Sequence, residues 1–385
     1  MERIAFIAAI VLVFYGVVPG IGAFVVRARW RLFRARMIDA SLRPSVGYVQ
    51  LRSNDPSAGY LGVYRCFGTL EAIQADDTLW ITDGKISLAV RMSDEHVYYL
   101  APGLYASGTD QNELPDDTPT IVPWAKVGSL PEGTRMFVCG PLYVQNGTAV
   151  FRSDGATSLT VLIYDGSPES VLERSIWSGR HRNEYWNQLT PGSLAAGSLS
   201  LLILASVYIG SPWLRSSAIL AVAGSLMPVL PLMPPGVPLF FVYRRWWQQA
   251  RSLRAERDLM RLPLRFDDTL RGGASDGQQY EQRPVTPEEA QQLLSAGARL
   301  RSASLPQAQV GDQMVGFGMI DAQGVLTRPS DPLSEFLVVQ GDPAIVSGRC
   351  DRRARSLERL AAVAFSAGLA LNLYLALVVM NWLLR

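Results

Sequence analysis

Four stretches of the sequence contain no Asp, Glu, Lys or Arg and are long enough to cross a membrane. They are residues 4–26, 191–214, 216–243 and 360–384. The hydrocarbon core of a bilayer is about 30 Å thick, and a helix of about 20 apolar residues spans it. In lipid every backbone polar group must be satisfied within the protein, so such segments fold as helices. The sequence therefore predicts a multi-pass α-helical membrane protein with four transmembrane helices.

The third stretch, residues 216–243, contains several prolines that a regular helix cannot accommodate. They are Pro228, Pro231, Pro234, Pro235 and Pro238. Proline has no backbone N–H and clashes with the preceding helical turn. The stretch is also longer than one straight crossing requires. We therefore expect a helix from residue 216 to about 230, a break at Pro234, Pro235 and Gly236, and a second helix from about Pro238.

Arginine clusters flank these stretches and predict their orientation. Arginines beside a transmembrane helix resist translocation and stay in the cytoplasm. The topogenic residues are Arg27, Arg29, Arg31, Arg244, Arg245, Arg352 and Arg353. All of them lie on one side if both termini are outside and residues 37–190 and 244–359 are cytoplasmic. We expect this topology in a bacterial inner membrane, with residues 4–26 as an uncleaved anchor, because a cleaved signal would export its arginines.

The cysteines and histidines are sparse. Cys66, Cys139 and Cys350 are far apart and form no C-x-x-C pair, which predicts reduced, partly buried thiols in the cytoplasm. His96 and His181 have no spacing to cysteine that is typical of a metal site. We expect no metal, no cofactor and no catalytic residues.

The sequence pattern of residues 37–166 predicts a β-rich cytoplasmic domain. Short runs of β-branched and aromatic residues alternate with turn residues, as in YLGVYRCFGTLEAI, TLWI, ISLAVRM, RMFVCGPLYV, TAVF and LTVLIY. The number and length of the strands favour a small OB-like barrel. Acidic residues outnumber basic ones between Ala40 and Thr190, which disfavours nucleic-acid binding because phosphate would be repelled.

Two segments of this domain resemble each other, DGKISLAV from Asp83 and DGATSLTV from Asp154. Asp-Gly between strands is a hairpin signal. Either the hairpin is duplicated or two unrelated hairpins share their turn chemistry.

Residues 167–190 predict an interfacial helix, with Ser167 as its cap and Pro168 at its first position. Tryptophans near the spans are expected to anchor the protein at the membrane interface. The anchors are Trp30, Trp177, Trp186, Trp246 and Trp247. An acid–base pair of His181 and Glu184 is disfavoured because no nucleophile is nearby.

The pattern of residues 244–359 predicts a helix leaving the membrane, a polar linker over 267–284, and a small α+β unit. Thr286, Pro287 and Glu289 form a capping-box pattern, so a helix should run from Pro287 to about Arg299. Strands are expected in QMVGFGMI, GVLT and EFLVV. The unit could pack against residues 37–166 to complete one cytoplasmic body.

Within the spans, small and polar residues predict helix packing. Close contact between helices needs small side chains, and amides can hydrogen-bond across helices. The predicted packing residues are Ala362, Ser366, Ala370, Asn372, Ser193 and Gly197. A pore-lining role for Asn372 is the alternative.

The preferred function is a non-catalytic scaffold or assembly and quality-control factor that acts through the cytoplasmic β domain. Its expected partners are the lipid bilayer and other proteins, or further copies of the chain bound through the transmembrane helices, with no nucleic acid. The alternative is a channel or transport component that uses the proline-broken third helix. The spans contain no ionisable residue, which disfavours ion-coupled transport. A membrane enzyme with metal at Asp76, Asp77 and Asp83 is less favoured.

Overall fold

The computed structural model describes most of the chain. The described residues are 2–47, 51, 59–74, 76–93, 95–100, 118–127, 129–145, 147–155, 157–270, 280–321 and 323–383, without the side chains of 267–270. The chain divides into two compact units. The helical unit comprises Met1–Arg31, His181–Arg254 and Asp351–Arg385, and the sheet unit comprises Leu32–Arg180 and Ala255–Cys350.

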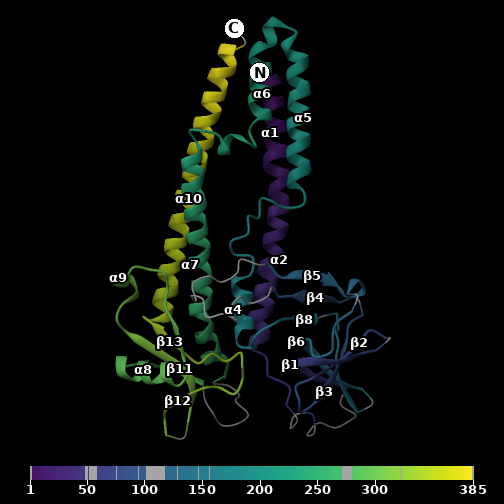
Figure 1. Cartoon of the computed structure of the whole chain (residues 1–385), viewed down its shortest axis with the longest axis vertical. Coiled ribbons are helices and arrows are strands. Elements are labelled where there is room, and N and C mark those ends of the chain that lie inside the picture. Colours follow the sequence, from purple (N-terminus) through teal and green to yellow (C-terminus); the bar gives the residue numbers. More distant parts are fainter. Residues whose placement is uncertain are drawn as a thin grey trace. The chain divides into compact units, whose positions relative to one another are not determined.

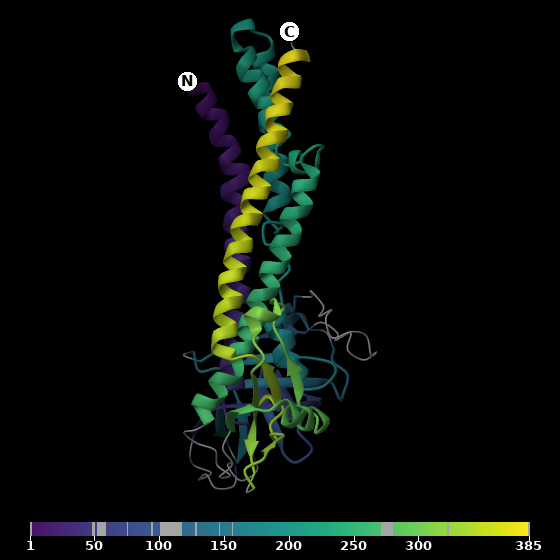
Figure 2. The same ribbon diagram turned by 90° about the vertical axis from the view of Figure 1, so that its left-hand side faces the viewer.

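Three helices are long and apolar enough to cross a membrane (Figure 1). The first, Glu2–Ser41, consists of α1 (Glu2–Val11), a π-helical turn η1 (Leu12–Val17) and α2 (Val18–Ser41). The others are α5 (Thr190–Ile209) and α10 (Pro343–Leu383), and α10 is a single uninterrupted helix (Figure 2). The described part of the chain thus combines three candidate membrane helices, one fewer than predicted, with a β domain.

The predicted third crossing, residues 216–243, is not one helix. Here α6 (Arg215–Ser225) is followed by turns and a 3₁₀ turn, η5 (Leu230–Leu232), before α7 (Val237–Leu270) begins. The expectation that the first helix reaches residue 230 is wrong, because α6 ends at Ser225. Pro228 explains the earlier end, since it cannot donate a helical hydrogen bond and disfavours helical residues before it. Neither α6 nor α7 is among the three candidate membrane helices.

Three helices of the helical unit share an apolar core. Ile7 of α1, Leu201 and Ala205 of α5, and Ala221 of α6 are buried together. The short connection between α5 and α6 contains a 3₁₀ turn, η4 (Pro212–Leu214). Burial of these apolar faces against one another holds α1, α5 and α6 together.

The sheet unit contains a five-stranded closed β-barrel with three added strands. The barrel strands are β1 (Tyr60–Ile73), β2 (Thr78–Thr82), β3 (Ser87–Arg91), β6 (Arg135–Gln145) and β7 (Thr148–Phe151). Their order is β1-β2-β3-β7-β6, and β6 pairs with β1 to close the barrel. The β3–β7 pair is parallel and the others are antiparallel. This arrangement fits an OB-like barrel.

The added strands extend the barrel from β6. They are β8 (Thr160–Ile163), β4 (His96–Tyr99) and β5 (Thr120–Pro123), in the order β6-β8-β4-β5. The core is built from alternate residues of the barrel strands, as the two-residue period of a strand requires. Examples are Leu79 and Ile81 in β2 and Leu88 and Val90 in β3.

A second sheet belongs to the same unit. It contains β9 (Tyr280–Val285), β10 (Arg299–Arg301), β11 (Met314–Ile320), β12 (Leu326–Thr327) and β13 (Leu337–Gln340). Helix α8 (Pro287–Ser295) buries Ala290 and Leu293 against Val338 in this sheet. A four-residue helix, α9 (Gln307–Val310), precedes β11. The capping box at Thr286 and Glu289 is confirmed, and α8 ends four residues before the expected end at Arg299.

Two further predictions need correction. The expected helix over 167–190 is confined to α4 (Ser170–Trp177), because Gly179 adopts a left-handed conformation with φ of 68° that stops it. The first Asp-Gly segment forms the β2–β3 hairpin, but the strands around the second, β7 and β8, both pair with β6. The two segments therefore resemble each other in their turns and not in their strand pairing. In each turn the aspartate, Asp83 or Asp154, accepts hydrogen bonding from the backbone N–H of residues that follow it.

Residues 271–279 of the predicted linker lie outside the described residues, its first residues end α7, and its last residues belong to β9. Residue 384, the predicted end of the fourth span, is also outside them.

Candidate functional site

A group of aromatic and basic side chains lies on the outside of the barrel. Tyr60, at the start of β1, is 54% exposed, and its ring centroid is 5.2 Å from that of Tyr143 in β6. The guanidinium of Arg152 stacks over the Tyr143 ring at 4.1 Å from its centroid. We call these three residues the tyrosine–arginine patch.

The barrel positions this patch through strand pairing. Tyr60 is directly opposite Tyr143 in the β1–β6 register. The backbone N–H of Arg152 donates to the carbonyl of Pro141, which brings its side chain over β6. The Tyr143 hydroxyl is 3.4 Å from a carboxylate oxygen of Asp154. The patch lies beside the β6–β7 connection, which corresponds to a loop through which OB barrels bind their ligands.

A second polar arrangement holds the non-helical segment between α6 and α7 against α10. The side-chain amide of Asn372, in α10, donates to the carbonyl oxygens of Leu230 at 2.5 Å and Met233 at 2.7 Å. Its oxygen accepts from the backbone N–H of Gly236 at 3.2 Å. Asn372 is 3% exposed, so all three hydrogen bonds are shielded from water. We call this arrangement the asparagine joint.

Glycine is required at the asparagine joint. A side chain at Gly236 would collide with the Asn372 amide and would lie 3.0 Å from the carbonyl oxygen of Gly368. The predicted break residues Pro234, Pro235 and Gly236 all lie in the segment between α6 and α7, and Pro238 is the second residue of α7. The structure thus brings the predicted break and the predicted mid-span asparagine together.

The other packing residues of α10 have a different environment. Ala362, Ser366 and Ala370 are exposed within the chain. Within residues 360–383 of this helix, the buried small residues are Ala361, Ala364 and Gly368, on the same face as Asn372. The face of α10 that packs within the chain is therefore displaced from the predicted face. The sequence did not decide between the two, because small residues form more than one stripe along this helix.

Ser193 and Gly197 of α5 pack against the π-helical turn. The Ser193 hydroxyl donates to the carbonyl of Phe14 at 2.6 Å. A Cβ at position 197 would lie 2.7 Å from atoms of both Phe14 and Tyr15, so only glycine fits. Pro19 lacks an N–H for the preceding helical turn. The Tyr15 carbonyl instead accepts from the Tyr185 hydroxyl at 2.8 Å.

Arginines and carboxylates form a cluster beside the apolar helices. Glu184 accepts from Arg27 at 2.7 Å and from Arg251 at 3.1 Å. Arg254 makes two hydrogen bonds to Glu358, at 2.7 and 2.6 Å. These five residues, the arginine–glutamate cluster, connect α2, the segment before α5, α7 and α10 within the helical unit. His181 bonds Ser252 at 2.9 Å, and Glu184 is occupied by the two arginines.

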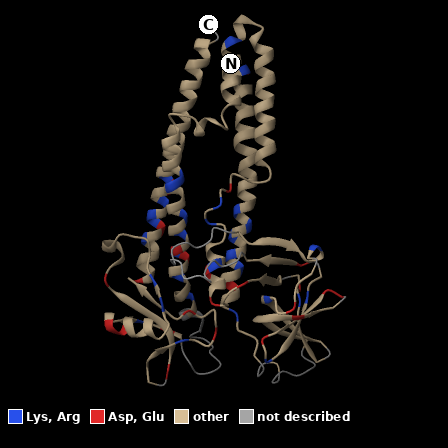
Figure 3. Cartoon of the chain, in the orientation of Figure 1, with Lys and Arg blue, Asp and Glu red and all other residues tan. Residues whose placement is uncertain are grey.

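The remaining topogenic residues differ from Arg27. All six are exposed and form no ion pair with another residue that the structure describes. They are Arg29, Arg31, Arg244, Arg245, Arg352 and Arg353. Figure 3 shows basic residues on α2, α7 and α10 where the apolar stretches end.

The predicted interface anchors have unequal exposure. Trp186 is 58% exposed, whereas Trp30 is only 5% exposed and packs against protein. Trp177, Trp246 and Trp247 are half-buried. Arg251 lies over the Trp247 ring at 4.6 Å from its centroid. Among the predicted anchors, Trp186 therefore has the most exposed side chain.

The sheet unit contains a buried ion pair. Arg65 of β1 is 4% exposed and donates to the Asp331 carboxylate at 2.8 Å and to the Arg43 carbonyl at 2.6 Å. Burial raises the pKa of Asp331, but hydrogen bonds from Arg65 and Ser334 and the Arg65 charge outweigh it and lower this pKa below its ordinary value. Asp331 lies beyond β12, so the pair connects the barrel to the second sheet.

The acidic residues considered for metal binding have structural contacts. Asp77 accepts from the Trp124 indole N–H at 2.9 Å, and Asp83 accepts from two N–H groups of its turn. Within the described ranges no group of three or more His, Cys, Asp or Glu could hold a metal ion. The three cysteines are buried and form no disulfide.

Sequence reasoning missed the tyrosine–arginine patch and the carboxylates of the arginine–glutamate cluster. The patch depends on the β1–β6 register, which no local pattern reveals. Glu184 had a detectable signal, since it is the single acidic residue between His181 and Arg254.

Comparison with known proteins found no matching family model, no matching curated protein and no matching solved structure.

Proposed function

We propose that this protein is a membrane-anchored, non-catalytic scaffold whose OB-like barrel holds a protein partner through the tyrosine–arginine patch. The observation that carries the proposal is the exposed Tyr60 beside the half-buried Tyr143, with an arginine stacked on the Tyr143 ring. Tyrosine and arginine are enriched among the residues that dominate protein–protein binding energy.

The preorganisation of the patch supports this role. Arg152 is held by its backbone hydrogen bond and by its contact with Tyr143, so little side-chain freedom remains to be lost on binding. A nucleic acid is disfavoured as the ligand because the surrounding domain is acidic. A protein surface with an apolar centre and a carboxylate fits the two rings and the guanidinium.

We further propose that the chain crosses a bacterial inner membrane four times, with both termini outside. The third crossing would combine α6, the asparagine joint and the start of α7, because α6 rises only about 17 Å. Non-helical backbone is tolerated at this depth where protein groups satisfy it, as Asn372 does. The arginine clusters would then all be cytoplasmic.

A reporter that is active only outside the cytoplasm tests this topology. Fused after Arg385 it should be active, and inserted after Gly84, in the exposed β2–β3 turn, it should be silent. The reverse pattern would contradict the orientation.

Site-specific photocrosslinking in living cells tests the scaffold proposal. A photoreactive phenylalanine at position 60 should give a discrete protein adduct, whereas the same residue at position 73 should not. Ile73 is the matched control because it is 43% exposed at the other end of β1. Tyr60→Ala with Tyr143→Ala should then reduce recovery of that partner at least tenfold without changing the circular dichroism spectrum. Equal crosslinking at positions 60 and 73, or none at either, would exclude the patch as the binding surface.

A further inference from the structure

Nine of the arginines in the helical unit form two classes, an inner class of three and an outer class of six. Those of the inner class, Arg27, Arg251 and Arg254, each pair with a carboxylate. Arg254 is also 3.5 Å from Asp351, which in turn pairs with Arg355. These contacts hold the helices together and leave the inner arginines little capacity for another anion.

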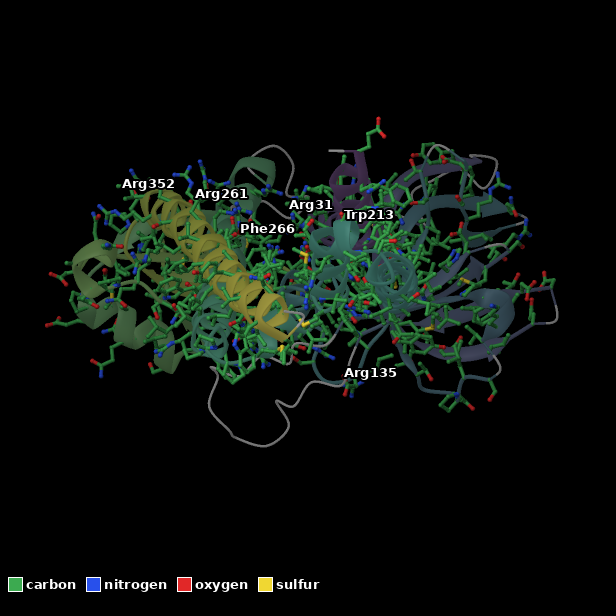
Figure 4. The ribbon with its side chains drawn as sticks, turned by 90° about the horizontal axis from the view of Figure 1, so that it is seen from above. Arg31, Arg135, Trp213, Arg261, Phe266 and Arg352 are labelled. Carbon is green, nitrogen blue, oxygen red and sulfur yellow. The ribbon has the colours of Figure 1, made fainter. Side chains whose placement is uncertain are left out.

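The outer class consists of the six exposed topogenic arginines, Arg29, Arg31, Arg244, Arg245, Arg352 and Arg353. None of them has an ion pair with a residue in the described part of the chain. They come from α2, α7 and α10, and Figure 4 labels Arg31 and Arg352 among them. A topogenic role explains why they remain on one side of the membrane, but it leaves their charge uncompensated in the folded protein.

The helical unit cannot supply the missing counter-charge. Apart from Glu2 at the far end of α1, the acidic residues of this unit up to Leu383 are Glu184, Asp351 and Glu358. All three already bind arginines. The outer class therefore presents a basic surface whose charge is neutralised neither by this unit nor by any other residue that the structure describes.

The position of this surface identifies the counterion. Arg244 and Arg245 directly follow the apolar start of α7, and Arg29 and Arg31 follow the apolar part of Glu2–Ser41. The exposed indole of Trp186 and the half-buried Trp246 lie in the same unit, and tryptophan favours the headgroup level of a bilayer. Guanidinium groups at that level meet lipid phosphates, to which they can donate two parallel hydrogen bonds.

We propose that the outer arginines form a binding surface for the headgroups of anionic phospholipids. The surface selects lipids with a net negative charge over zwitterionic lipids, whose positive amine offsets the phosphate. It is independent of the tyrosine–arginine patch, and no step of the proposal depends on a protein partner.

Quenching of tryptophan fluorescence by brominated lipid tests the proposal on the full-length protein in bilayers. Brominated phosphatidylglycerol should quench more strongly than brominated phosphatidylcholine at equal mole fraction, and the difference should shrink with added salt. In Arg352→Gln/Arg353→Gln the relative binding constant for the anionic lipid should fall about tenfold, since one arginine near an anionic surface contributes about fivefold before screening.

Two further variants make the result decisive. Arg352→Lys/Arg353→Lys keeps the charge and should retain the preference for the anionic lipid. Lys85→Gln/Arg91→Gln removes the same charge from exposed positions of the barrel and should also retain it. Equal quenching by both lipids in the native protein, or an unchanged preference in Arg352→Gln/Arg353→Gln, would overturn the proposal.

Discussion

Arg65 and Asp331, which are 266 positions apart in the sequence, form an ion pair that fastens the barrel to the second sheet of the sheet unit. The Asp331 carboxylate also accepts from the Ser334 hydroxyl at 2.8 Å and from the Leu333 N–H at 3.2 Å. Both of its oxygens are therefore engaged. The pair lies within the compact unit that combines Leu32–Arg180 with Ala255–Cys350.

Removing the carboxylate should destabilise the sheet unit strongly. Asp331→Ala leaves the Arg65 guanidinium buried without its counter-charge, and breaking a buried pair in this way costs about 3 kcal/mol. The double variant Arg65→Met/Asp331→Leu should lose less, because no uncompensated charge remains. Urea unfolding of the full chain in detergent measures both losses. Asp312→Ala is the control, because Asp312 is exposed, and it should change stability by less than about 0.5 kcal/mol.

The Asp331 pair should also make stability depend on pH in the acid range. The folded-state pKa of Asp331 is lower than its ordinary value of 3.8. The ionised pair therefore stabilises the fold fully above the unfolded-state pKa, and this contribution is lost as pH falls through the folded-state pKa. We expect the stability difference between the native protein and Asp331→Asn to be constant from about pH 7 to 5 and to shrink below about pH 4. A difference that stayed constant down to pH 3 would show that the carboxylate charge is unimportant.

Buried thiols give a third test. Burial raises the pKa of Cys66 and of Cys139 to about 12. Because only the thiolate reacts, alkylation by iodoacetamide at pH 8 should be about a thousandfold slower than for free cysteine, and it should become fast in urea. Timed alkylation of a Cys350→Ser background, followed by mass spectrometry, measures the two rates. Rapid modification of the native protein would mean that the barrel opens readily.

Local patterns predicted the barrel strands well. The segment from Tyr60 to Ile73 coincides with β1, and TAVF coincides with β7. Strand alternation and turn residues are local properties, so they are visible without the fold. The strands β4 and β5 were not predicted, because they are stabilised by pairing with β8 and with each other, and such pairing is not visible in a local pattern.

The asparagine joint and the tyrosine–arginine patch were harder to predict, because both depend on contacts between residues that are far apart in the sequence. Proline chemistry indicated a break near Pro234, and the position of an amide side chain in the middle of the fourth stretch indicated a role for Asn372. Which helix Asn372 meets depends on tertiary packing, and so does the contact of Tyr60 with Tyr143. The choice between the stripes containing Ala361 and Ala362 was likewise undetermined, because small residues occupy both.

The asparagine joint should contribute measurably to the stability of the membrane helices. Asn372→Leu would remove three hydrogen bonds in an apolar setting and leave Leu230, Met233 and Gly236 only the turn hydrogen bonds that they make with one another. Hydrogen bonds between membrane helices average about 0.6 kcal/mol each, so three should contribute about 2 kcal/mol. Unfolding of the purified protein by SDS titration measures the loss. Ser366→Ala, on an exposed face of the same helix, should unfold like the native protein. Equal losses of stability in both variants would show that the hydrogen bonds of Asn372 do not hold the segment between α6 and α7 against α10.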